Sequence, residues 1–116
     1  MNILKKLFGG QKTTEEVRET KEKDFDKVKY EGVRALRMHQ FDLAAKFLEQ
    51  ALQLNAEDLE CRDYLSQAYI SMGDLQKAYA QLQKISEAQP GNVAVLLRMA
   101  DVAYMMEDYI AMTDVC

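Results

Sequence analysis

The side chains with the strongest potential for chemistry are two cysteines and one histidine. Cys61 and Cys116 stand 55 positions apart, and His39 lies close to neither of them in sequence. A zinc site needs about four closely organised ligands, and a disulfide framework in a small secreted domain uses more cysteines. We therefore expect two free thiols in a reducing compartment, with no metal and no cofactor.

Other catalytic signatures are missing from the sequence. It contains no Gly-rich phosphate loop, no H-E-x-x-H pair and no nucleophile elbow. The acidic pairs Glu15-Glu16 and Glu57-Asp58 are typical of helix starts, where the helix dipole favours negative charge. The sequence therefore predicts a protein that is not an enzyme.

Composition limits the class of protein and of partner. The chain has 116 residues, of which 48% are hydrophobic and 29% charged, which fits a single globular domain. Residues 1–24 carry six basic and five acidic side chains, which leaves a net charge of −5 on the remainder of a chain whose total is −4. An acidic body is a poor match for a phosphate backbone, so we expect no nucleic acid. The first ten residues have no signal-peptide core, and a cytoplasmic location is expected.

Elements that could position a binding site repeat along the chain with a period of 34 residues. Small residues recur at Gly32, Ser66 and Ala100. Larger apolar residues recur in three further series: Leu36, Ile70 and Tyr104; Met38, Met72 and Met106; Phe41, Leu75 and Tyr109. Repeats of this length are typical of stacked helical units.

Within one period, two helical patterns are separated by a turn. In the middle unit the first pattern ends at Gly73-Asp74, where Gly suits a left-handed C-cap and Asp suits an N-cap. Equivalent helices are predicted at about 24–38 and 41–54, with Asn55 capping the next helix. The third unit predicts a helix over about 93–105 and a second one that starts near Asp108.

These residues resemble the tetratricopeptide repeat, whose pattern is a Trp-x-x-Leu-Gly-x-x-Tyr start, a central Ala-x-x-x-Phe and a late Pro. The middle unit fits best and matches at Leu65, Ser66, Tyr69, Ala78, Leu82 and Pro90. The resemblance covers about residues 25–116, although none of the units has the Trp. It implies an all-α fold, an α-solenoid of stacked helix-turn-helix units with the third unit incomplete. The units would be 25–58, 59–92 and a partial 93–116, after an N-terminal segment and charged linker or helix at 1–24.

The resemblance also implies a function. Arrays of this family hold a protein or peptide in a concave groove lined by the first helix of each unit, which would make this chain a scaffold or adaptor. Mapped by repeat position, the predicted groove residues are Lys29, Val33, Leu36, Arg37, Asp63, Gln67, Ile70, Leu97, Arg98, Asp101 and Tyr104.

Two alternative functions stay open. Ile3, Leu4, Leu7 and Phe8 form one apolar face beside two lysines, which could give weak contact with an anionic membrane and define a membrane-peripheral assembly factor. The incomplete third unit would leave apolar side chains bare, which could make the chain a self-associating structural subunit, a homo-oligomer. Residues 11–24 are highly charged and are predicted to extend the first helix as a solvated segment.

Overall fold

The structure, a computed structural model, describes the backbone of residues 14–115 and the side chains of residues 14–108. The helices are α2 (Thr14–Arg37), α3 (Phe41–Leu54), α4 (Leu59–Met72), α5 (Leu75–Ala88) and α6 (Val93–Val115). Residues 14–115 contain no strand, which confirms the predicted all-α class. Within that range no helix is both long and apolar enough to cross a bilayer.

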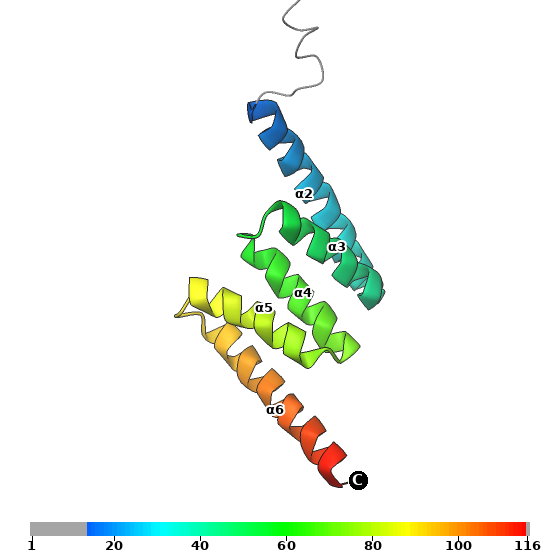
Figure 1. The fold of residues 1–116 in the computed structure, drawn as a ribbon, viewed down its shortest axis with the longest axis vertical. Coiled ribbons are helices and arrows are strands. Elements are labelled where there is room, and N and C mark those ends of the chain that lie inside the picture. The colour runs from blue at the N-terminus through cyan, green and yellow to red at the C-terminus, as the bar shows by residue number, and fades with distance from the viewer. Residues whose placement is uncertain (1–13, 116) are drawn as a thin grey trace, which may run out of the picture.

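The helices follow one another as a staggered array (Figure 1). Each packs on the next in sequence, and α2 also contacts α4. The core forms two clusters, one of α2, α3 and α4 with Ala78 of α5, which includes Leu48 and Leu65, and one around Leu82 and Val102 between α5 and α6. Ile70 of α4 packs against both clusters and joins them. This pattern of neighbour-on-neighbour packing is that of a helical repeat.

α2 begins well before its packed part, as the charge pattern of residues 11–24 predicted. Its first turn carries Glu15 and Glu16 at the positive end of the helix dipole. Side chains stay largely exposed until Phe25, the first buried residue of the helix. Further along, a Cβ added at Gly32 would lie 2.8 Å from the Cδ2 and Cγ atoms of buried Leu48. A side chain at this position would therefore crowd Leu48 of α3, and glycine avoids that contact.

The turn between α4 and α5 forms at the predicted place, with Asp74 at the N-cap position of α5, although its side chain makes no capping hydrogen bond. Gly73 adopts the left-handed conformation, with φ of 82°, and its amide donates to the carbonyl of Ile70. At the later turn the Oδ1 atom of Asn92 accepts from the amide of Val95, which caps α6. The prediction that Asn55 caps α4 is wrong. Asp58 is the N-cap, because its carboxylate accepts from the amide of Glu60 while Asn55 lies beyond the end of α3.

The third unit differs from its prediction. We expected a second helix to start near Asp108, yet α6 runs without a break from Val93 to Val115. The position that Gly73 holds in the middle unit is occupied by Glu107, which has no preference for a left-handed backbone and favours continued helix. No helix of the described range returns over α6, and Ala100 is exposed there, whereas Gly32 and Ser66 at the equivalent places are buried.

Candidate functional site

A cavity of about 340 Å³ lies between α2 and α4. Three of the predicted groove residues line it: Lys29, Val33 and Arg37. The remaining lining residues are Asp26, Tyr30, Arg34, Glu60 and Tyr64. Cavities of about 440 to 550 Å³ lie elsewhere, at the α2–α3 junction and beside the helix turns, but they contain none of the predicted residues. We therefore take the α2/α4 cavity as the candidate site.

Charge is distributed unevenly along this cavity. Asp26 lies about two helical turns before Arg34 on α2, and Glu60 lies on the first turn of α4. The acidic side chains therefore gather toward the start of both helices, and the two arginines gather at the end of α2. Tyr30, Val33 and Tyr64 lie between these ends along their helices. Tyr30 exposes 65% of its surface, so an aromatic ring is open to a ligand here.

Lys29 is partly buried, and its charge is already paired with carboxylates of this chain. Its Nζ atom lies 2.7 Å from Asp58 Oδ2 and 2.8 Å from Glu60 Oε1, and it sits over the Phe25 ring at 5.6 Å. Partial burial lowers the pKa of Lys29, but hydrogen bonds to Asp58 and Glu60 and their charges outweigh burial, so the pKa is raised. Lys29 therefore ties α2 to the start of α4 and forms one wall of the cavity.

Arg34 and Arg37 stand in contrast, because both are exposed. Among residues 14–108, neither guanidinium has a carboxylate within ion-pair distance. An Arg fork offers five donors and binds carboxylate and phosphate groups in two-point geometry. These two side chains are therefore free to bind an acidic group of a partner.

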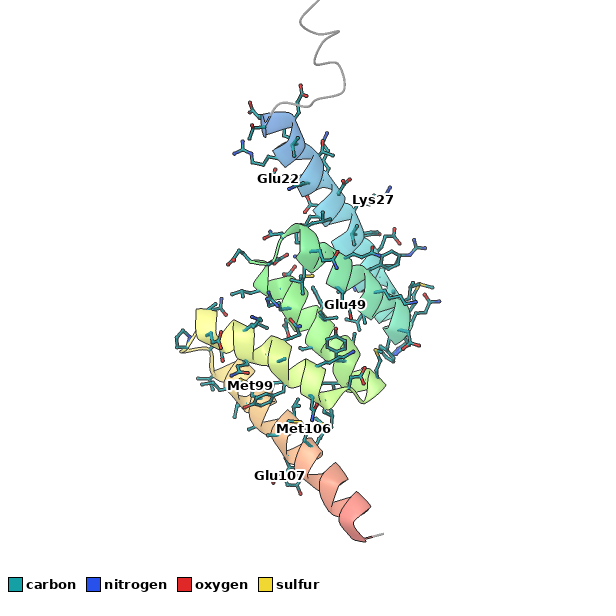
Figure 2. The ribbon with its side chains drawn as sticks, viewed as in Figure 1. Glu22, Lys27, Glu49, Met99, Met106 and Glu107 are labelled. Carbon is teal, nitrogen blue, oxygen red and sulfur yellow. The ribbon has the colours of Figure 1, made fainter. Side chains whose placement is uncertain are left out.

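The predicted residues on α4 and α6 do not line the same cavity. Asp63 and Arg98 pair with each other and join α4 to α6. Ile70, like Leu36 of α2, is partly buried and packs on the core. Leu97, Asp101 and Tyr104 of α6 are exposed, and Gln67 is half-buried. Figure 2 shows Met99 and Met106 on α6 near α5, which they contact through the core. The structure thus divides the predicted groove into an α2/α4 part and an α4/α6 part.

Tyr30 and Arg34 lie outside the predicted set. Tyr30 carried a sequence signal, because Tyr64 stands 34 residues later and the two tyrosines line the same cavity. Arg34 carried no such signal, since its counterpart one unit later is Ala68, a core residue.

The side chains with catalytic potential are placed unfavourably for chemistry. Cys61 is fully buried, and its Sγ donates to the carbonyl oxygen of Leu48. Burial, together with the charge of Asp58, raises the pKa of Cys61 to about 11, so the thiol is protonated at neutral pH. His39 is exposed and packs edge-on against Phe41. In the described part of the chain, no three His, Cys, Asp or Glu side chains are grouped closely enough to hold a metal ion.

The fold defines the chain as a helical repeat protein with a cavity between α2 and α4. A family model described as tetratricopeptide repeat matches residues 35–96, more than half of the chain. The chain belongs to the tetratricopeptide repeat family. No curated protein matches it. The family supports a general role as a scaffold for protein–protein interaction.

The N-terminal membrane prediction is not tested by this geometry. Ile3, Leu4, Leu7 and Phe8 lie outside the described residues, and weak membrane contact through them stays a prediction. The cytoplasmic location also stays a prediction.

Proposed function

We propose that this chain is an adaptor that binds a segment of a partner protein in the α2/α4 cavity. The observation that carries the proposal is that Arg34 and Arg37, at one end of the cavity, have no ion-pair partner among the described side chains, while the middle of the cavity is aromatic and aliphatic. An exposed arginine can form charge-assisted hydrogen bonds with acidic groups of a bound segment.

The lining favours a particular ligand chemistry. An acidic side chain or phosphate of the partner would meet Arg34 and Arg37, and an apolar or aromatic side chain would lie against Tyr30 and Tyr64. At the opposite end Glu60 is already paired with Lys29, and Asp26 disfavours an acidic group there, so the charges also set the direction of the bound segment. The proposal needs none of the α6 residues, whose role in a longer groove stays a prediction.

The test replaces both arginines with glutamine in the full chain, Arg34→Gln with Arg37→Gln. Neutralisation is preferred to reversal, because a negative charge in the last turn of α2 would oppose the helix dipole. Lys29 is left intact, since its ion pairs hold α2 to α4. The matched control is Lys46→Gln with Lys84→Gln, which removes two exposed positive charges from α3 and α5.

Partners are captured with the wild-type chain and both variants and compared by quantitative mass spectrometry. We expect specific partners to be lost from the arginine variant and retained by the lysine control, with unchanged helical circular dichroism for both. Equal capture by the two variants would rule out the α2/α4 cavity as the binding site.

A further inference from the structure

One side of α6 is apolar and has no covering helix in the described part of the chain. Val95 and Val102, with Met99 and Met106 beside them, pack α6 against α5. Figure 2 shows the two methionines on this side of α6. At 3.6 residues per turn, the opposite side of α6 carries Val93, Leu97, Ala100 and Tyr104. All four are exposed, with exposed fractions of 64% for Val93, 62% for Leu97 and 68% for Tyr104.

The spacing of these four residues is that of a coiled-coil seam. They follow one another at intervals of four, three and four, which matches alternating a and d positions of a heptad. Scattered exposed apolar residues are ordinary, but a continuous stripe at this spacing is suited to a second helix. We call the four residues the α6 seam.

We propose that the α6 seam pairs with the same seam of a second copy of this chain, with the two helices antiparallel. In the two-fold arrangement centred between Leu97 and Ala100, Leu97 lies opposite the partner's Ala100. Val93 then lies opposite the partner's Tyr104. Each large side chain faces a smaller one, so the seam is complementary to itself.

Charge selects the antiparallel direction. Arg98 is the single basic residue of α6, and it is already paired with Asp63 of α4. Asp101, Glu107 and Asp108 are acidic and exposed. In parallel helices each of these would face its own copy, which is repulsive. In the antiparallel register Glu107 and Asp108 lie opposite positions 90 and 89 of the partner, just before the start of its α6, where the helix dipole favours negative charge.

The contact between two α6 seams is small, so we expect a weak dimer. A seam of two heptads buries less than the roughly 1,200 Å² at which stable protein interfaces begin. The dimer should therefore be in exchange with monomer, with a Kd in the micromolar range or weaker. The pairing does not rest on the peptide-binding proposal, because the α2/α4 cavity contains no residue of α6.

The first test is sedimentation equilibrium of the full chain from about 10 to 500 µM. We expect a monomer–dimer equilibrium for the wild type and at least a tenfold rise in Kd for Leu97→Glu, which puts a charge in the seam. Leu43→Glu is the matched control, since Leu43 is an exposed leucine of α3 away from the seam, and its Kd should be unchanged. A wild type that stays monomeric throughout, or equal effects of both variants, overturns the proposal.

The second test reads the direction of pairing by disulfide cross-linking. Val93→Cys and Tyr104→Cys chains are each prepared with Cys116→Ser, while Cys61 stays because it is buried. A disulfide requires Cα atoms within about 7 Å. Antiparallel pairing predicts that the mixed Val93→Cys/Tyr104→Cys dimer forms faster than either self-linked dimer. Faster self-linking would indicate parallel pairing and overturn the proposed arrangement.

Discussion

His39 and Gly73 occupy the same place in successive repeat units, 34 residues apart, and both have a left-handed backbone, with φ of 60° and 82°. Each lies where one helix ends and the next begins. Glycine adopts this conformation without steric cost, whereas a residue with a Cβ does not. The repeat therefore imposes one backbone geometry on two different side chains.

Replacing Gly73 with alanine should destabilise the fold by about 1 kcal/mol. A Cβ at this position meets nothing within 4 Å, so the loss would come from backbone strain alone. Urea unfolding followed by circular dichroism should show a lower midpoint with an unchanged slope. An unchanged midpoint would mean that the turn does not require the left-handed conformation.

Replacing His39 with glycine should stabilise the fold, the opposite of the effect expected for Gly73→Ala. Relief of strain would stabilise the fold, and the greater freedom of glycine in the unfolded chain would offset part of it, leaving a gain of up to about 1 kcal/mol. The edge-on contact between His39 and Phe41 is lost in this variant, so His39→Ala is the control that loses the contact and keeps the strain. A glycine variant no more stable than the alanine variant would contradict the argument.

Replacing Gly32 with alanine should destabilise the packing of α2 on α3. The new Cβ would stand 2.8 Å from the buried Leu48 side chain, and overpacking of this kind costs about 1–3 kcal/mol. Alanine recovers up to about 1 kcal/mol as a better helix former, so we expect a net loss of about 1–2 kcal/mol. Gly91→Ala is the control, because a Cβ there meets nothing within 4 Å. Thermal unfolding of the two variants gives the comparison.

The Cys61 thiol should react slowly in the folded chain and should make stability depend on pH. Its pKa is raised from 9.0 to about 11, chiefly by burial. The folded state therefore holds the proton more tightly, and this contribution to stability is complete below about pH 9 and lost as pH rises toward 11. The check is the free energy of unfolding between pH 8 and 11, compared with Cys61→Ala.

In the Cys61→Ala variant the free energy of unfolding should fall less steeply as pH rises. Any pH dependence that remains comes from other titratable groups. Tyr69 is one of these, since burial and its hydrogen bond to Glu49 raise its pKa as well. In a Cys116→Ser chain, a thiol reagent should label Cys61 far faster in urea than in buffer. Equal rates would show that the thiol is accessible in the folded protein.

The ion pair between Lys29 and Asp58 should contribute about 0.5–1 kcal/mol to stability, because both side chains are mostly buried but still reach solvent. A double-mutant cycle with Lys29→Met and Asp58→Asn isolates it. Asparagine keeps an oxygen able to cap the Glu60 amide, so the N-cap of α4 is retained. A coupling energy near zero would show that Lys29 contributes through its packing on Phe25 rather than through its charge.

Local sequence patterns predicted most of the helices. The 34-residue recurrence and the Gly73-Asp74 turn predicted two helix pairs, and α3 spans the 41–54 that was expected. Helical spacing and turn residues act over a few neighbours, which is why they can be read from the sequence. The family resemblance, mapped by repeat position, implied that Lys29, Val33 and Arg37 lie in the groove, and these three residues line the α2/α4 cavity.

Interactions between units were not encoded in that pattern. The ion pairs of Lys29 with Asp58 and Glu60, and of Arg98 with Asp63, join residues about one repeat apart, and no local spacing signals them. The continuous α6 was missed for a different reason. Repeat position predicted a turn at Glu107, but the left-handed residue that would make it is absent.

Because each helix packs mainly on its neighbours in sequence, the arrangement also determines the order in which parts of the protein unfold locally. Thermal opening should start at α6, which packs mainly on α5 and contacts α4 through the Arg98–Asp63 ion pair, and should then move inward. Amide protons of α4, which lies between α3 and α5 and also touches α2, should exchange last. A ligand bound between α2 and α4 would then contact the helix that opens most slowly. Its residence time would not be limited by local unfolding of α6.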